Sequence, residues 1–448
     1  MSEEFFKYME QLFDPSQAPL KPKPLEGIRV IDVTMIILGP MSPSILGSLG
    51  AEVIKVEGPR GDWAWRPIIP AYKDNLNSGF AQDNLNKYHI SLDIRHPKGK
   101  EVFKRLVAKS DVLVENLTPE NMDLWGVGYK DLVQINPRLI YFWHGGWGRW
   151  GRYAGIPSYD ALGQAHSGLA GITGFPGCPP LRALDWIGDY FGALAGAFGV
   201  LVGLFYRELT GRGCYGEIGH PENLTRFMDW TWLYISLTGE DRPRTGNVDI
   251  ACGPAAILPC KDAMVAIAAV LDDEFKGLCE AMGKPQLAND PRFKDIPSRL
   301  KKENLEEIIR MMSEWVKDKT ANELEQIAEK YGFACAKVMN VKDQYESEHL
   351  RVRRQWLIVN DPIFGEVHIR GMPLHMSETP WHIRWVGRPY GIDTEFVLRH
   401  IVGLSTEEIE ELRKEGVCKD WRDMPEQLQK LGYAPPPYWK EEGKWLRT

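Results

Sequence analysis

A single carboxylate, Asp189, stands at the start of a long apolar segment in which a helix is predicted. No charged side chain occurs between Asp189 and residue 206. An aspartate at the start of a helix can cap it, because its oxygens accept hydrogen bonds from free backbone N–H groups. It can also serve as a nucleophile, with the same N–H groups stabilising a developing oxyanion. The position of Asp189 alone leaves both roles open.

Small and aromatic residues surround Asp189 in the sequence. Gly188 and Gly192 leave room beside the carboxylate for a bulky reactant, although close helix packing would use glycine equally well. Aromatic side chains crowd the flanking segments, where they either line a pocket for an aromatic or bulky organic acid or pack in the core. These aromatic residues are Trp143, Trp147, Trp150, Tyr153 and Trp186.

The first half of the chain alternates strands and helices. Buried strands are predicted at residues 27–33, 51–56, 111–115 and 139–143, and helices at residues 40–49, 98–110 and 131–136. This alternation predicts an α/β fold with an open, mostly parallel sheet. Ligands of such sheets bind beyond the carboxyl ends of the strands, so the segments that follow these strands are candidate binding loops.

The α/β pattern stops near residue 225, and a smaller second domain is predicted after it. A strand at residues 264–270 and helices at residues 275–282 and 304–331 belong to this part. Extended segments at residues 355–360 and 365–370 and a charged helix at residues 406–415 follow.

Composition and charge argue against several classes of protein. The formal net charge of −7 disfavours a nucleic-acid binder or a protein that binds anionic membranes. The apolar run of residues 193–206 is too short to span a bilayer, and the acidic N-terminus has no signal-peptide pattern, so a cytoplasmic location is expected. The seven cysteines form no C-x-x-C pair and the ten histidines have no metal-ligand spacing, so no metal site is expected.

The first strand and its turn lack the pattern of a dinucleotide-binding site. The turn from Thr34 to Pro40 has one glycine where that fingerprint has three, and a proline where a helix N–H would be useful. The sequence therefore argues against a Rossmann dehydrogenase.

Sequence blocks over nearly 200 residues resemble the family III CoA-transferases. They include residues 24–32 (PLEGIRVID), 49–57 (LGAEVIKVE), 111–116 (DVLVEN), 136–141 (NPRLIY), 188–189 and 210–213 (TGRG). The resemblance implies a large Rossmann-like domain built from residues 1–228 and 345–448 and a small α/β domain of residues 229–344. It also implies that two subunits are threaded through one another as an interlocked dimer.

The resemblance implies that Asp189 is the nucleophile of a CoA transfer. Its carboxylate would attack the thioester of an acyl-CoA to give a mixed anhydride, which the CoA thiolate would convert to an aspartyl-CoA thioester. An acceptor acid would then take the CoA by the reverse steps. The implied partners are an acyl-CoA, with coenzyme A as co-substrate, and an organic acid. The implied assembly is a homodimer or a heteromer with a paralogous subunit, and neither metal nor ATP is needed.

Residues that match the family's CoA contacts lie in several separate segments. They are Met35, Ile37, Leu38, Leu92, Arg95, Asn116, Leu117, Trp125 and Tyr159. Gly58 and Leu124 stand where the family has basic residues, so Arg60 is the nearest basic side chain after the second strand for a phosphate contact.

Two alternatives stand beside the transferase. The related α-methylacyl-CoA racemases use a His-Asp step in the block that is Ser158-Tyr159-Asp160 here. Tyr159 is a poor base at neutral pH, but His144 and His166 lie nearby in the sequence. The other alternative is a non-catalytic subunit of a heteromeric CoA-transferase, and the presence of Asp189 argues against it. The acceptor is left open among aryl and carnitine-like acids.

Overall fold

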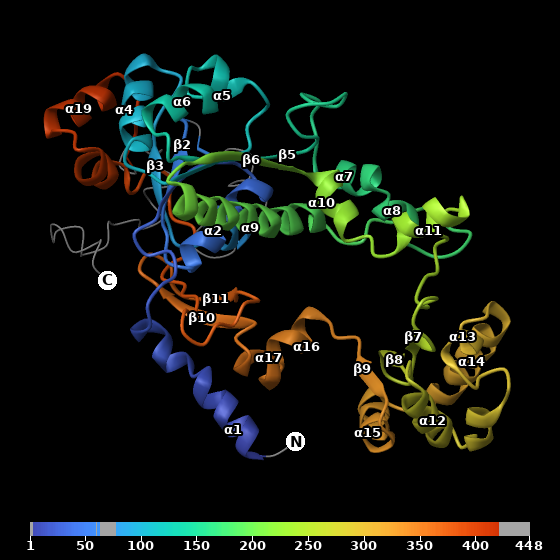
Figure 1. Cartoon of the computed structure of the whole chain (residues 1–448). Coiled ribbons are helices and arrows are strands. Elements are labelled where there is room, and N and C mark those ends of the chain that lie inside the picture. Colours follow the sequence, from blue (N-terminus) through green and yellow to red (C-terminus); the bar gives the residue numbers. More distant parts are fainter. Residues whose placement is uncertain (1–2, 60, 63–77, 421–448) are drawn as a thin grey trace. The chain divides into compact units, whose positions relative to one another are not determined.

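Figure 1 shows the computed structural model of the chain, which describes residues 3–59, 61–62 and 78–420. Its contacts divide the chain into two compact units. The large unit takes its described residues from Met1–Ser167, Leu184–Met228 and Arg351–Thr448, and the small unit consists of Gly168–Ala183 and Asp229–Leu350. The domain boundaries at residues 228/229 and 344/345 stay predictions.

A six-stranded parallel sheet forms the centre of the large unit. Its strands lie in the order β3-β2-β1-β4-β5-β6, and Ile31 of β1 is opposite both Ile54 of β2 and Leu113 of β4. The bounds are β1 Arg29–Val33, β2 Glu52–Glu57, β3 Lys87–Ser91, β4 Val112–Glu115, β5 Ile140–Gly145 and β6 Cys214–Gly219. This is the strand order of doubly wound sheets. The predicted α/β class with an open parallel sheet is confirmed.

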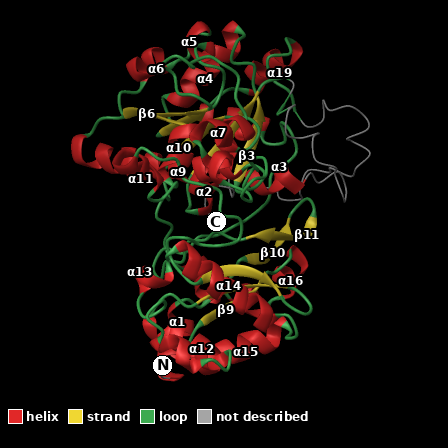
Figure 2. Ribbon diagram, turned by 90° about the vertical axis from the view of Figure 1, so that its right-hand side faces the viewer, coloured by secondary structure: helices red, strands yellow, loops and turns green. Residues whose placement is uncertain are grey.

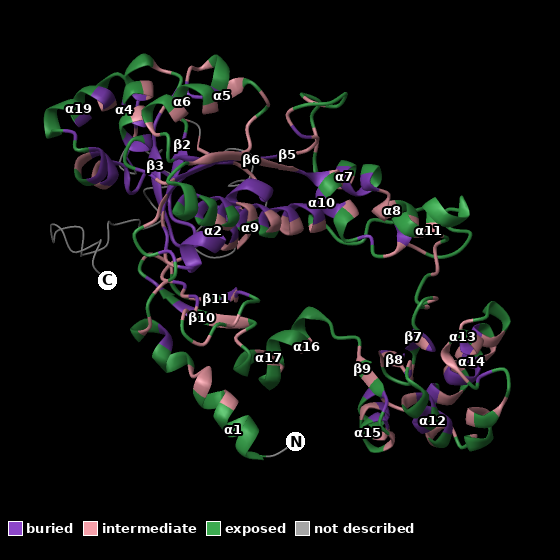
Figure 3. Ribbon diagram, in the orientation of Figure 1, coloured by how far each residue is buried: buried purple, intermediate pink, exposed green. Residues whose placement is uncertain are grey.

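Alternate residues of each strand point to opposite faces of the sheet, and each face builds its own core. On one face Ile31 packs in a cluster with α4 (Pro97–Val107) and α19 (Thr406–Lys414). On the other face Val30 packs in a cluster with α2 (Leu38–Ser48) and α9 (Ile187–Thr210). Figure 1 shows these two helix layers on either side of the strands, and Figure 3 shows that most of the sheet between them is buried, whereas its edge strand β6 is intermediate.

Glycines on one side of α9 let this helix lie directly on the sheet. A Cβ atom at Gly196 would clash with the ring of His144, and one at Gly199 would clash with the ring of Phe142, both on β5. Gly203 lies in the same way over Ile140, the first residue of β5. Because interiors are close-packed, larger side chains here would push the helix away from the sheet. These glycines therefore fix the position of α9 and of the residues in its first turn.

The opposite side of α9 is apolar and exposed. The exposed side chains are Leu194, Phe198, Val202, Phe205 and Leu209, with Phe198 at 68% and Leu209 at 70%. Of the described residues, α9 is the helix whose length and composition would suit a membrane span, with a mean hydropathy of 1.6 and half of that window buried. A core helix passes the same test, so the finding has little weight. The helix is longer than the apolar run of residues 193–206 used in the sequence analysis.

Shorter elements complete the large unit. Residues 355–360 and 365–370 form the predicted strands as an antiparallel pair, β10 (Trp356–Asp361) and β11 (Gly365–Arg370). The remaining elements are α1 Glu3–Leu12, η1 Pro15–Leu20, α3 Ser78–Asp83, α5 Asn121–Leu124, α6 Tyr129–Ile135, α7 Asp160–Ser167, α10 His220–Arg226, α18 Thr394–Phe396 and η3 Val397–Val402. Helix α17 (Glu348–Val352) spans the last boundary between the units.

The small unit is a three-stranded antiparallel sheet with helices, as Figure 2 shows. Its strands, in the order β7-β8-β9, are β7 Ala255–Pro259, β8 Met264–Ala268 and β9 Ala334–Lys337. Its helices are α8 Leu169–Ile172, α11 Thr231–Thr238, α12 Asp272–Ala281, η2 Pro285–Asn289, α13 Ile296–Arg299, α14 Lys302–Val316, α15 Ala321–Tyr331 and α16 Val341–Glu346. The single helix predicted at residues 304–331 is wrong, because Thr320 and Glu323 form a capping box that starts a second helix.

Candidate functional site

Asp189 lies in the first turn of α9 and is 7% exposed. It does not cap the helix. The side chain that takes this role is Asp160, the first residue of α7, whose Oδ1 accepts a hydrogen bond of 2.7 Å from the backbone N–H of Gly188. The carboxylate of Asp189 is thus not used to satisfy the start of its own helix.

Asp160 joins two segments that are distant in the sequence. Its Oδ2 accepts a hydrogen bond of 2.6 Å from Nε2 of Gln164, and the same amide donates to the carbonyl oxygen of Leu184 at 2.7 Å. Asp160 is 3% exposed, so its bonds are shielded from water. These contacts hold the chain on both sides of Trp186, whose left-handed backbone (φ 62°) starts α9. The orientation of Asp189 therefore depends on α7.

His220 is the side chain that contacts the carboxylate of Asp189. Its Nε2 lies 2.8 Å from Oδ1 of Asp189, and both side chains are nearly buried, at 5% and 10% exposure. His220 follows directly after β6, at the carboxyl end of that strand, and begins α10. His220 is not among the site residues predicted from the sequence. The signal that could have found it is its place after a parallel strand, where such folds bind ligands.

Burial and neighbouring groups act in opposite directions on Asp189. Burial raises the pKa of Asp189 above the ordinary aspartate range, and the negative charge of Asp160 adds to this effect. The hydrogen bond with His220 acts to lower that pKa, but burial outweighs it. A carboxylate that has lost its water shell is a better nucleophile than a hydrated one. The environment of Asp189 therefore suits nucleophilic attack better than surface solvation would.

The loop between β1 and α2 lies beside the first turns of α9. A Cβ atom at Gly192 would clash with the side chain of Leu38, so the two segments are in contact. Asn116, just after β4, fixes the loop by accepting a bond of 2.7 Å from the Met35 N–H and donating one of 2.8 Å to its carbonyl oxygen. Ile36 has a left-handed backbone (φ 68°), a strained conformation for a β-branched residue. Its N–H donates to Oδ2 of Asp62 at 3.1 Å.

A buried cluster of charged side chains is hydrogen-bonded to the backbone at both ends of this loop. Asp32 lies between the ammonium groups of Lys87, at 2.7 Å, and Lys55, at 3.9 Å, and all three side chains have zero exposure. Lys55 donates to the carbonyl oxygen of Thr34 at 2.8 Å, and Lys87 donates to that of Pro40 at 2.6 Å. Burial lowers the pKa of Lys87 to about 8, although Asp32 acts in the other direction. The ends of the loop are therefore tied to an ionic interior.

The structure brings together part of the predicted CoA site. Met35 and Asn116 are hydrogen-bonded to each other, and Leu38 contacts α9 at Gly192. Leu117 and Trp125 are half-buried against one core of the sheet, and Ile37 and Leu92 are fully buried, so their side chains are covered.

The other predicted CoA contacts are dispersed. Arg95 is exposed, and its guanidinium is bound to both carboxylate oxygens of Asp93 at 2.8 and 3.0 Å. Tyr159 is 64% exposed and precedes Asp160. Arg60 lies outside the described residues.

The histidines considered for the racemase alternative do not lie against Asp189. His144 is fully buried beneath Gly196, and burial lowers its pKa to about 3. His166 is exposed and packs with the rings of Trp147 and Tyr153 at centroid distances of 4.8 and 4.9 Å. Within the described part of the chain, His220 is the histidine that is hydrogen-bonded to Asp189.

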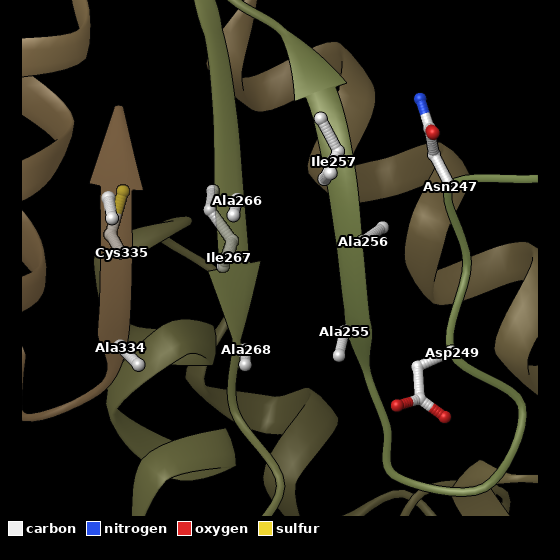
Figure 4. A pocket seen from close by; sticks show the side chains of 11 residues that line it. Asn247, Asp249, Ala255, Ala256, Ile257, Ala266, Ile267, Ala268, Ala334 and Cys335 are labelled. Atoms are coloured by element: carbon white, nitrogen blue, oxygen red, sulfur yellow. The ribbon is translucent and has the colours of Figure 1, made fainter. Parts of the chain in front are cut away.

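A cavity of about 370 Å³ lies on the sheet of the small unit, and none of these residues lines it. Figure 4 shows its lining of small side chains from β7, β8 and β9, such as Ala256, Ala266 and Cys335. Burial raises the pKa of Cys335 to about 11, so it is a thiol at neutral pH and a weak nucleophile. The carboxylate of Asp249 also lines this cavity, and its Oδ1 accepts hydrogen bonds of 2.8 and 2.9 Å from the N–H groups of Ala251 and Cys252. Among the described residues no cluster of three or more His, Cys, Asp and Glu side chains could hold a metal ion.

Comparisons with known proteins agree with this fold. The family model described as CoA-transferase family III matches residues 25–394. Succinyl-CoA–D-citramalate CoA-transferase of Chloroflexus aurantiacus is 32% identical over 417 residues, which cover 90% of this chain and 99% of that protein. The alpha subunit of succinyl-CoA–L-malate CoA-transferase from Chloroflexus aurantiacus is 34% identical over 393 residues, which cover 87% and 91%.

A crystal structure is also similar over most of the chain. A CAIB/BAIF family protein from Brucella suis has a TM-score of 0.74 at 27% sequence identity, and the match covers 84% of this chain and 98% of that protein. The sequence blocks, the parallel sheet and the matched relatives agree. The chain belongs to CoA-transferase family III.

Proposed function

We propose that this protein moves CoA from an acyl-CoA donor to an organic acid through covalent intermediates on Asp189. The observation that carries the proposal is the state of this carboxylate. It is nearly buried, it is not used as a helix cap, and a hydrogen bond of 2.8 Å from His220 occupies Oδ1. Of the described residues, none donates a hydrogen bond to Oδ2, so the protein does not occupy the lone pairs of this oxygen.

The steps follow from ordinary acyl chemistry. Oδ2 attacks the thioester carbonyl carbon, the C–S bond breaks, and a mixed anhydride and the CoA thiolate form. The thiolate then attacks Cγ of Asp189, and the donor acid leaves as a carboxylate. The acceptor carboxylate attacks the resulting aspartyl-CoA thioester, and the same steps run in reverse. One thioester replaces another, so the reaction needs no external energy source.

The loop between β1 and α2 is the proposed support for bound CoA. Leu38 contacts α9 at Gly192, and Asn116 holds the backbone of Met35. These contacts place the loop beside the first turns of α9, where the thioester must arrive. Leu117, Trp125, Arg95 and Tyr159 are proposed as further CoA contacts, together with Ile37, Leu92 and Arg60.

A second subunit is proposed to cover the exposed apolar side of α9. Isolated apolar side chains are common on protein surfaces, but a row of large ones along one helix indicates a contact surface. The partner is either a second copy of this chain or a paralogous subunit. The L-malate transferase of Chloroflexus aurantiacus, by its name, has alpha and beta subunits, and both are 34% identical to this chain.

The transferase proposal is tested with purified protein, a set of donors and a set of acids. Relatives are named for succinyl-CoA, acetyl-CoA and formyl-CoA, so these are the first donors. Acceptors are citramalate and malate, and aryl and carnitine-like acids for the aromatic segments near Asp189. The expected result is a new acyl-CoA together with release of the donor acid. If the purified homomer transfers CoA between none of the donor and acceptor pairs, and activity appears after co-expression with a paralogue, this chain would be a non-catalytic subunit.

The racemase is the second candidate function, because a histidine next to Asp189 could act in proton transfer. Incubation of the acyl-CoA thioesters in deuterated water separates the two. Transfer predicts release of the donor acid without deuterium at the carbon next to the thioester. Deuterium uptake without acid release would overturn the transferase proposal.

Asp160→Asn is expected to shift the acid limb of the rate profile to lower pH. The variant keeps an oxygen for the Gly188 N–H and removes the negative charge that helps to raise the pKa of Asp189. Because the nucleophile is the ionised carboxylate, a lower pKa extends activity to more acidic solutions. The measurement is kcat against pH for both proteins. An acid limb that stays in place or moves to higher pH would contradict this role of Asp160.

A further inference from the structure

The contact between His220 and Asp189 has a defined direction. Nε2 of His220 is 2.8 Å from Oδ1, and Nδ1 is buried with no hydrogen-bond partner among the described residues. If Asp189 carried the proton, Nδ1 would be a buried N–H without an acceptor, which is costly. If Nε2 of His220 carries the proton instead, Nδ1 has a lone pair without a donor, which costs less than a buried N–H without an acceptor. The geometry therefore favours a carboxylate that accepts from a neutral imidazole.

The imidazole is held in place by its surroundings. A Cβ atom at Gly163 of α7 would lie 2.5 Å from Cβ of His220, so the backbone of α7 packs against the histidine. Asn223, one turn further along α10, lies 3.4 Å from the carbonyl oxygen of Gly188 through its amide. The first turns of α9 and α10 are thus connected twice. Nε2 of His220 is therefore held 2.8 Å from Oδ1 before any reaction begins.

We infer that His220 is a further catalytic residue, which stabilises the oxyanion that forms on Oδ1 whenever the carbonyl carbon of Asp189 is attacked. The inference rests on the proposed covalent function of Asp189. Once Oδ2 has become the bridging oxygen of the anhydride, Oδ1 is the carbonyl oxygen of the aspartyl group. Attack by the CoA thiolate forms the S–Cγ bond and moves an electron pair onto Oδ1. Collapse returns that pair and breaks the Cγ–Oδ2 bond, and the donor carboxylate leaves.

The hydrogen bond matters most in these tetrahedral states. A donor already 2.8 Å from Oδ1 stabilises the full negative charge of the oxyanion more than the partial charge of the carbonyl. When the acceptor carboxylate attacks Cγ of the aspartyl-CoA thioester, an electron pair again moves onto Oδ1. The same oxyanion therefore forms before the CoA thiolate leaves. No proton leaves His220 at any step, so it acts as a donor and not as a base.

His220→Gln and His220→Asn test this with the same functional group at two lengths. The Gln amide N–H can occupy the position of Nε2, whereas the Asn amide is one methylene shorter and cannot reach Oδ1. Each variant is mixed with succinyl-CoA, acetyl-CoA or formyl-CoA without acceptor, and aspartyl-CoA formation on Asp189 is followed by quenching and mass spectrometry. We expect His220→Asn to be slower by about 10²- to 10³-fold and His220→Gln to stay within about tenfold of wild type.

The outcomes separate this inference from the proposed function. If wild type forms no adduct on Asp189 with any of the donors, the covalent function fails and the role of His220 fails with it. If wild type forms the adduct and the two variants are equally slow, or His220→Asn is as fast as wild type, only the oxyanion role is overturned. Urea unfolding of both variants checks that they are folded. A proton-abstracting His220 would also predict no rescue by Gln, since an amide is not a base.

Discussion

Replacement of Asp189 by asparagine is expected to lower the rate of CoA exchange by about 10⁴-fold or more, because the amide oxygen cannot form the anhydride. The amide can still accept the hydrogen bond from His220, so the first turn of α9 should keep its structure. The measurement is the rate of CoA transfer between a donor and acceptor pair that wild type uses, with urea unfolding as the test of folding. Asp189→Ala should lose activity to a similar degree.

Asp185→Asn is the matched control, because Asp185 lies four residues before Asp189 and is exposed. The same change there should leave the rate within about twofold of wild type, since surface substitutions away from a site have small effects. A rate for Asp189→Asn within about tenfold of wild type would contradict a covalent role for this carboxylate. The exchange would then have to proceed by direct transfer between the two substrates.

Asp32→Asn is expected to lower the free energy of unfolding by about 3–5 kcal/mol, the usual cost of removing one partner from a buried ion pair. Lys87 and Lys55 would keep their positive charges in an interior with zero exposure. Burial acts to raise the pKa of Asp32, but the two lysines outweigh it, so the pKa lies below its ordinary value. The stabilisation is therefore present at neutral pH and is lost as the pH falls through this lowered pKa. Urea titration at pH 7 measures the change.

Asp131→Asn, an exposed change in the first turn of α6, serves as the control and should cost less than about 1 kcal/mol. A loss below that value for Asp32→Asn would contradict the view that Asp32 neutralises the two lysines. Because the cluster also holds Thr34 and Pro40, the variant should bind acyl-CoA more weakly as well. Weaker acyl-CoA binding by the folded variant would show that Asp32 positions the loop, because a loss of global stability alone would not change the affinity of the folded protein.

The sequence predicted the strands in which apolar residues are adjacent and missed those in which they are mostly separated by polar residues or glycine. β4 and β5 begin with uninterrupted apolar runs, and β1 and β2 have apolar pairs beside the buried charges of Asp32 and Lys55, as expected for strands covered on both faces. β3 contains Lys87, which is buried in an ion pair with Asp32, and His89, which is buried with its Nδ1 3.0 Å from Oε2 of Glu57. β6 contains two glycines and Glu217 and is half-exposed at the edge of the sheet. Pairing between distant segments, and not local composition, forms these two strands.

The missed strand also explains the missed residue. His220 follows β6 as Asn116 follows β4, but without a strand at 214–219 nothing in the sequence placed it at the edge of the sheet where ligands bind. Asp189 was found through its apolar surroundings and the resemblance of its block. Asp160 belongs to the block Ser158-Tyr159-Asp160, but its hydrogen bond with Gly188 spans 28 residues and could not be derived from sequence spacing.

The ionic interior beneath the β1–α2 loop also bears on chemical self-damage. An enzyme that handles thioesters and anhydrides releases strong acylating agents next to its own amines, and a neutral lysine is readily acylated. Lys55 and Lys87 have zero exposure. Their amines are not exposed to acylating groups in solution. Surface lysines such as Lys7, whose side chain is 66% exposed, are not protected in this way. Under the proposed mechanism, the fold thus shields the two lysines that hold the β1–α2 loop from acylation by intermediates formed at Asp189.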